Sequence, residues 1–274
     1  MSDRDSVTVA IVGTGEMGAA VGLRLREAGA RVITSIAGRS AVSVARVRDA
    51  GLEVVKDDDS LMRDASFVLS IVPPGVAVEV AEQLRGPVSR AEEPPVYVEC
   101  NAISPATCRR IGDLFDATNF IDAGIIGGPP ATGTQDPAKG PRFYASGRDA
   151  YLLTRLASFG LDIAVLDGPV GAASGLKLSY AGLTKGFTAL CATMLGAAER
   201  EGLAEALRAE LARSQPGFLA RIERAIPDMR PKAYRWVAEM RQIAEYIGSP
   251  DDGATIYEGA ALLYQRIAND MRRE

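Results

Sequence analysis

One stretch near the N-terminus decides the fold: Val7-Thr8-Val9-Ala10-Ile11-Val12-Gly13-Thr14-Gly15-Glu16-Met17-Gly18. Its apolar first half is rich in β-branched residues, which is typical of a strand buried in a parallel sheet. The second half spaces three glycines as G-x-G-x-x-G, and the alanine-rich residues 19–28 that follow predict a helix. In a dinucleotide site Gly13 makes the tight turn, Gly15 lets the backbone approach a pyrophosphate, and Gly18 lets the helix pack closely on the strand.

The context of this glycine motif favours dinucleotide binding. Alone, the motif also fits an ordinary glycine-rich turn between a strand and a helix. Here a strand precedes it, a helix follows it, and residues 31–36 predict a second strand. The helix N-terminus would present free N–H groups and a positive dipole end to the phosphates. We therefore predict cofactor contacts from Gly13, Thr14, Gly15, Glu16, Met17 and Gly18.

The composition excludes several kinds of chemistry. The chain has 274 residues, a net charge of −4 and no basic block, which argues against a nucleic-acid partner. The absence of histidine excludes histidine acid–base catalysis, Ser-His-Asp triads and histidine-bound zinc. The three cysteines form no C-x-x-C pair, so we expect no metal site and no disulfide framework. The polar residues 1–6 show no signal-peptide pattern, and we expect a cytoplasmic protein.

Residues 178–198 resemble a membrane span because Lys185 is their only charge. The segment also contains several threonines and glycines, and no second span follows it. We therefore expect no membrane association, and predict a helix buried on all sides at a domain or subunit core.

The end of the second predicted strand indicates which dinucleotide binds. An NAD site usually carries an acid here for the ribose 2′-hydroxyl, whereas this chain has Arg39 and Ser40. A cation and a hydroxyl suit a 2′-phosphate, so we predict NADP over NAD. Alternatively, Arg39 is a solvated loop residue and Ser40 caps a helix over residues 41–50.

Later strand ends add further candidates, because the carboxyl ends of parallel strands line the cofactor crevice. A strand over residues 67–72 predicts cofactor contacts from Val72, Pro73 and Pro74. A strand over 96–99 leads to Asn101, which either touches the nicotinamide or substrate or is simply a turn residue. Cys100 is interpreted as a core thiol. A strand over 119–126 leads to Gly127 and Gly128, which line the substrate site or belong to an ordinary loop.

Strands and helices alternate up to about residue 166, with a helix at 149–159, and every later segment predicts helix. The helices are expected at 173–214, 216–226, 232–247 and 252–273, with breaks at Pro227, Pro231 and residues 248–250. The predicted fold is α/β: a Rossmann-type doubly wound parallel sheet over residues 1–167, then an all-α domain over 168–274.

These features together resemble the β-hydroxyacid dehydrogenase superfamily, which includes 6-phosphogluconate dehydrogenase and 3-hydroxyisobutyrate dehydrogenase. The family's G-x-G-x-M-G is present at residues 13–18, and its substrate loop, Asp-Ala-Pro-Val-Ser-Gly-Gly, is similar to Asp122-Ala123-Gly124-Ile125-Ile126-Gly127-Gly128. Its catalytic stretch, Gly-x-Gly-x-x-x-Lys, is similar to residues 171–177. By this match Lys177 is the catalytic lysine, whereas helix spacing alone would favour a surface lysine. Residues 231–247 also look like a C-terminal domain of unknown function found in such oxidoreductases.

The chain departs from the family at two places. Ile126 replaces the loop serine, and Tyr180 and Ala181 replace the paired asparagines. A less polar substrate, or one held differently, is implied. Tyr180 is expected to bind substrate or orient the lysine, and Lys185 to bind a substrate carboxylate or lower the pKa of Lys177. Packing is the alternative for both.

Together with the NADP prediction from Arg39 and Ser40, the resemblance implies an NADP-dependent oxidoreductase that interconverts a 3-hydroxy acid, or related alcohol, with its carbonyl. Lys177 would act as general acid and base. An imine reductase and a non-catalytic NADP sensor are the alternatives. The apolar C-terminal helices predict a homodimer.

Overall fold

The computed structural model describes residues 7–115, 120–134, 136–248 and 253–273. The chain forms two compact units that divide between Lys177 and Leu178. This division falls inside helix α6 (Ala172–Ala181), whereas the sequence suggested a domain boundary at residue 167.

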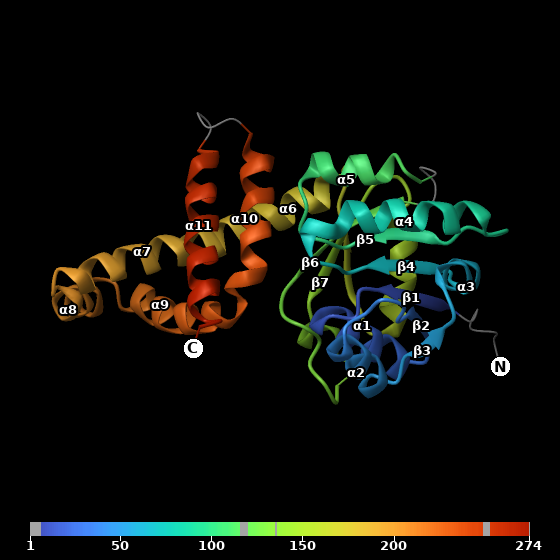
Figure 1. Cartoon of the computed structure of the whole chain (residues 1–274), viewed down its shortest axis with the longest axis horizontal. Helices are drawn as coiled ribbons and strands as arrows, with labels where there is room; N and C mark the ends of the chain where they lie inside the picture. The colour runs from blue at the N-terminus through green and yellow to red at the C-terminus, as the bar shows by residue number, and fades with distance from the viewer. Residues whose placement is uncertain (1–6, 116–119, 135, 249–252, 274) are drawn as a thin grey trace. The chain divides into compact units, whose positions relative to one another are not determined.

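The first unit is built on one sheet with strand order β3-β2-β1-β4-β5-β6-β7-β8 (Figure 1). Its strands are β1 (Thr8–Val12), β2 (Arg31–Ser35), β3 (Glu53–Val55), β4 (Phe67–Ser70), β5 (Val96–Glu99), β6 (Phe120–Ile126), β7 (Arg142–Ser146) and β8 (Asp162–Val165). The predicted α/β fold is confirmed. One detail is wrong: β6 and β7 pair antiparallel, while the other neighbours pair parallel. Among the described residues, the β6–β7 connection carries the short 3₁₀ helix η3 (Pro137–Lys139), whereas the crossover of a parallel pair usually contains an α-helix.

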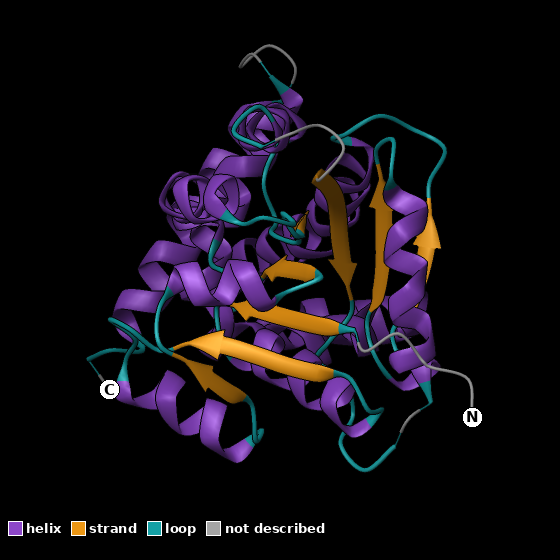
Figure 2. Cartoon of the chain, turned by 90° about the vertical axis from the view of Figure 1, so that its right-hand side faces the viewer, coloured by secondary structure: helices purple, strands orange, loops and turns teal. Residues whose placement is uncertain are grey.

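Helices cover both faces of the sheet (Figure 2). Alternating side chains of β1 show why: Val9 and Ile11 join one core, and Ala10 and Val12 join the other. The first core is closed by α1 (Glu16–Glu27), α2 (Ala41–Asp49) and the 3₁₀ helix η4 (Ala150–Phe159). The second is closed by α3 (Asp58–Asp64), α4 (Ala77–Arg90) and α5 (Pro105–Gly112). The short 3₁₀ helix η1 (Pro74–Val76) precedes α4.

The helix expected at 149–159 is of the 3₁₀ type. Its bonds run from residue i+3 to residue i, as in Leu152 N to Asp149 O at 2.9 Å and Gly160 N to Ala157 O at 3.1 Å.

The second unit is all helical, as predicted. After α6 come the π-helical segment η5 (Gly182–Gly186), α7 (Phe187–Arg200), α8 (Ala204–Ser214), α9 (Pro216–Met229), η6 (Arg230–Lys232), α10 (Ala233–Ile247) and α11 (Ala254–Asp270). The expected stretch 173–214 is interrupted by η5 and by a turn at Gly202, whose φ is +72°. Pro227 lies inside α9 and does not end it. The start of the helix expected at 252 lies outside the described residues.

Residues 178–198 are not buried on all sides within their unit. Leu183, Leu190 and Met194 are exposed by 74%, 63% and 56%, while Thr188 and Cys191 are buried. The helix is therefore two-sided, with one face in the core of the unit and one apolar face open. None of the described helices is both long and apolar enough to cross a bilayer.

Candidate active site

The glycine turn between β1 and α1 leaves no room for side chains at two of its three glycines. Gly13 has a φ of +94°, and a Cβ there would lie 2.4 Å from the carbonyl oxygen of Ile71. A Cβ on Gly18 would lie 2.0 Å from the carbonyl oxygen of Gly13. At Gly15, the N-cap of α1, a Cβ would meet nothing within 4 Å. The turn therefore keeps open space at the position where a pyrophosphate would approach the backbone.

Side chains around the turn fit a bound dinucleotide. The Thr14 hydroxyl is buried and has no hydrogen-bond partner among the described residues, so it offers a donor to a ligand. Glu16 is exposed in the first turn of α1, whereas Met17 packs on the core under α1. A predicted contact of Met17 with the cofactor would thus come from its backbone.

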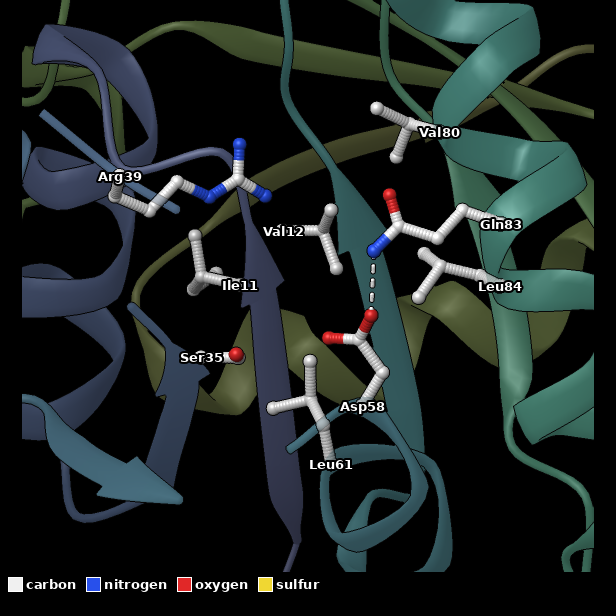
Figure 3. A pocket seen from close by; sticks show the side chains of 9 residues that line it. All are labelled: Ile11, Val12, Ser35, Arg39, Asp58, Leu61, Val80, Gln83 and Leu84. Atoms are coloured by element: carbon white, nitrogen blue, oxygen red, sulfur yellow. Dashed lines mark hydrogen bonds between the residues drawn. The ribbon is translucent and has the colours of Figure 1, made fainter. Parts of the chain in front are cut away.

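A hollow lies beyond the ends of β1 and β2 (Figure 3). Arg39 stands on one side of it, and Gln83 faces it from the other, donating from Nε2 to Asp58 Oδ2 at 2.6 Å. Ser40 caps α2 by accepting from Ser43 N at 3.3 Å, which confirms that part of its expected role. Sequence reasoning missed Asp58 and Gln83 because they come from helices and not from strand ends.

Asn101 joins the ends of β4 and β5. Its Oδ1 accepts from Val72 N at 2.7 Å and its Nδ2 donates to Ser70 Oγ at 3.2 Å. The side chain is 3% exposed, so both polar ends are committed to the protein. Asn101 holds the loop that carries Val72, Pro73 and Pro74; a direct contact with ligand stays a prediction.

Asp122 fixes the start of α6. Its carboxylate accepts from Gly171 N at 2.8 Å, from Ser174 N at 3.1 Å, and from Ser174 Oγ at 2.6 Å. Ser146 Oγ adds a fourth hydrogen bond at 2.9 Å and itself accepts from Ala173 N at 3.0 Å. A buried carboxylate thus satisfies the free N–H groups of the first turn and complements the helix dipole.

Lys177 follows one turn after Ser174 on the helix that Asp122 anchors. The helix packs tightly on β6 at Gly124, which has no side chain. A Cβ added there would lie 2.7 Å from Ala173 O and 3.1 Å from Lys177 Cβ. The half-buried Lys177 donates from Nζ to Cys100 O at 3.4 Å. Its ammonium therefore lies beside the carboxyl end of β5, at the edge of the sheet where β1 carries the glycine turn.

Glu99 is a buried acid that sequence reasoning did not single out. Its Oε1 accepts from Asn101 N at 2.9 Å, and its Oε2 has no hydrogen-bond partner among the described residues. Burial raises the pKa of Glu99 to about 8; Asp122 adds to the rise, and the Asn101 N–H and Lys177 oppose it. Burial also raises the pKa of the Cys100 thiol well above its usual value, which fits the core role expected of it.

The loop after β6 is tied to α1. Gly127 has a φ of +129° and packs on Pro141, while Gly128 is exposed with open space around it. Arg24 of α1, 2% exposed, donates to Ala131 O at 2.9 Å and to Asp136 O at 3.2 Å. The cofactor helix thus holds the loop that is expected to bind substrate. Arg24 was missed because its place on α1 gives no sign of its partners.

Tyr180 and Lys185 belong to the second unit. Tyr180 is 53% exposed. Lys185 forms an ion pair with Glu239 and lies over the Trp236 ring, 5.0 Å from its centre. Its charge already has a partner, which weighs toward the packing alternative; a substrate contact stays a prediction.

The comparisons with known proteins show the family and the fold of the chain. The family model described as the NAD binding domain of 6-phosphogluconate dehydrogenase matches residues 8–154, more than half of the chain. The chain belongs to this family. A domain of unknown function, DUF1932, matches residues 198–267, as expected for the C-terminal part of this NAD-binding oxidoreductase family.

Solved structures resemble the family member over almost its whole length. The conserved protein MTH1747 of unknown function, described as structurally similar to 3-hydroxyacid dehydrogenases, is 29% identical, with a TM-score of 0.71 over 96% of this chain and 97% of that one. Mycobacterium tuberculosis 3-hydroxyisobutyrate dehydrogenase is 19% identical, with a TM-score of 0.72 over 96% and 94%. A Streptomyces aurantiacus imine reductase is 17% identical, with a TM-score of 0.54 over 94% and 93%. The last two likenesses concern the fold.

Proposed function

We propose that the protein is an NADP-dependent oxidoreductase that interconverts a 3-hydroxy acid, or a related alcohol, with its carbonyl compound. The observation that carries this proposal is the position of Lys177. Its ammonium lies beside the carboxyl end of β5, on the sheet edge that also carries the glycine turn. The same helix is fixed at its start by Asp122. A proton-transfer group and a dinucleotide cradle are thus held on one rigid frame.

When bound, the nicotinamide supplies the acceptor or donor of the hydride. Lys177 performs the proton transfer: the neutral amine at Nζ takes the hydroxyl proton during oxidation, and the ammonium returns a proton to the carbonyl oxygen during reduction. The close packing of Gly124 against Lys177 Cβ limits the positions that the side chain adopts. The loop at Gly127 and Gly128 offers exposed backbone to a substrate carboxylate. Ile126, which stands where the family has a serine, places an apolar side chain next to this loop.

Arg39 supports the choice of NADP because it stands at the hollow beyond β2. We expect Arg39→Ala to weaken NADP binding about 10- to 100-fold, the value of a charge-assisted hydrogen bond, and to leave NAD binding unchanged. Fluorescence titration with NADPH and NADH measures both. Arg46→Ala, which removes an exposed arginine of α2, is the control for net charge. Equal losses for both cofactors would rule out a 2′-phosphate contact.

Two alternatives share the fold and are separated by substrate panels. An imine reductase is favoured by the structural likeness to the S. aurantiacus enzyme, and it predicts NADPH oxidation with cyclic imines and none with 3-oxo acids. A sensor predicts NADP binding with no turnover on any panel. The retained Lys177 favours the dehydrogenase.

We also propose a homodimer through the helical unit. Leu183, Leu190 and Met194 recur at helical spacing and leave an apolar stripe exposed. We expect sedimentation velocity to show a dimer for the wild type and a monomer for the double variant Leu190→Glu/Met194→Glu. Val165→Glu, which places the same charge on the exposed side of β8, is the control and should leave the dimer intact. A dimer that survives the double change would place the interface elsewhere.

A further inference from the structure

Four polar side chains form a continuous row across the buried sheet. In register, Ser70 of β4 is paired with Glu99 of β5, Glu99 with Asp122 of β6, and Asp122 with Ser146 of β7. All four are at most 1% exposed. Burying a polar group costs free energy unless the group is hydrogen-bonded. We therefore expect a row of four such groups in one sheet to have a structural or functional role.

The two ends of this polar row hold the two halves of the candidate site. At one end Ser70 Oγ accepts from Asn101 Nδ2 at 3.2 Å, and Asn101 in turn holds Val72 N. At the other end Asp122 and Ser146 bind the first turn of α6, which carries Lys177. Glu99 lies between the two ends in the strand register, and its Oε1 accepts from Asn101 N at 2.9 Å.

Glu99 and Asp122 occupy paired positions on neighbouring strands, whose backbones lie about 4.8 Å apart. Their carboxyl groups are near enough for Asp122 to raise the pKa of Glu99. Asp122 receives four hydrogen bonds, three of them from the start of α6, so both oxygens of its carboxyl group already accept hydrogen bonds. Glu99 accepts a backbone hydrogen bond from Asn101 N at its Oε1, and its Oε2 has no partner among the described residues. The proton of the pair therefore belongs on Glu99.

We propose that Glu99 is a positioning residue that carries a proton at neutral pH and keeps the polar row intact between the Val72 loop and the Lys177 helix. Loss of this proton puts a second negative charge beside Asp122 and loosens both anchor points. The consequence for turnover rests on the proposed oxidoreductase function, whereas the protonation of Glu99 does not.

The groups around Glu99 show which side chain of this cluster loses a proton near pH 8. The titratable or charged groups that face it are Asp122 from β6, Lys177 from α6, Cys108 from α5, and Tyr97 and Cys100 from β5 itself. Burial raises the pKa of Tyr97, Cys100 and Cys108 well above their ordinary values, so these three stay neutral near pH 8. The pKa of Glu99 is raised to about 8 by the same cause.

Infrared spectroscopy of the purified full chain tests the protonation directly. We expect a protonated-carboxyl C=O band at about pH 6.5 that is lost by about pH 9.5, and we expect Glu99→Gln to lack it. Glu79→Gln, which changes an exposed acid of α4, is the control and should keep the band. A wild type with no such band, or a band that persists in Glu99→Gln, overturns the proposal.

The pH dependence of stability and turnover tests the positioning role. Because the folded protein holds a proton that the unfolded chain releases near the ordinary glutamate pKa, the stability from this proton is complete at low pH and is lost as pH rises toward 8. The melting temperature should therefore fall more between about pH 5 and pH 8 in the wild type than in Glu99→Gln. On an identified substrate, the ratio of kcat at about pH 9 to kcat at about pH 7 should be about 10-fold lower in the wild type than in Glu99→Gln. Matching pH profiles would overturn the role; absence of turnover in both would count against the proposed function, and the infrared result would still decide the protonation.

Discussion

Replacement of Lys177 by methionine should lower kcat by about 100- to 10,000-fold, the contribution of a positioned general acid or base. Methionine keeps the length and much of the packing of the lysine stem and removes the proton-carrying group. NADP affinity should change little, because the glycine turn and Arg39 belong to other elements. Initial rates with a working substrate, together with NADPH titration, give both quantities.

The control for this change is Lys56→Met, which removes an exposed lysine that follows β3. It should keep wild-type rates, so that a loss in Lys177→Met reflects the site and not the net charge. Turnover by Lys177→Met at the wild-type rate would contradict the acid–base role and leave the lysine with packing alone.

Two substitutions in the glycine turn should affect stability and cofactor binding differently. In Gly18→Ala the new methyl group would lie 2.0 Å from Gly13 O, so the backbone of the turn would have to shift. We expect a loss of about 3 kcal/mol or more in the free energy of unfolding, together with loss of cofactor binding. In Gly15→Ala the methyl group meets no protein atom within 4 Å. Stability should then stay within about 1 kcal/mol of the wild type, while the methyl group blocks the pyrophosphate and lowers NADP affinity at least about 100-fold.

Each of the two variants is the matched control for the other. Urea unfolding and NADPH titration on both give a two-by-two result. NADP affinity at the wild-type level in Gly15→Ala would show that no pyrophosphate approaches the turn.

The parts of the fold that depend on local pattern were predictable from sequence. The β1–α1 turn, the strand ends and the Ser40 helix cap follow from glycine geometry, β-branched runs and capping chemistry. The antiparallel β6–β7 pair was missed because strand direction depends on what the connection contains, and a loop of glycines and prolines does not reveal it. The π-helical segment at Gly182–Gly186 was also missed. Its two end glycines lie against Tyr257, which is distant in sequence, and no local pattern indicates that contact.

The candidate site shows the same division. Lys177 and the glycines carry a recognisable spacing, so the sequence indicates them. Glu99, Asp122 and Arg24 act through partners that only the sheet register and the tertiary contacts bring together. Glu99 did leave one signal: a single acid closing an otherwise apolar strand. Charged residues are rarely buried unless they are paired or belong to a site. An acid at the end of an otherwise apolar strand is therefore a candidate site residue in other sequences as well.

The central claim is best tested by following NADP reduction across a panel of 3-hydroxy acids and simple alcohols, with the wild type and Lys177→Met measured side by side and NAD run in parallel. The account predicts NADP-linked turnover of at least one panel member by the wild type, little with NAD, and almost none by Lys177→Met. NADP binding without turnover on this panel and on the matching carbonyl compounds, or turnover that survives the loss of Lys177, would contradict it.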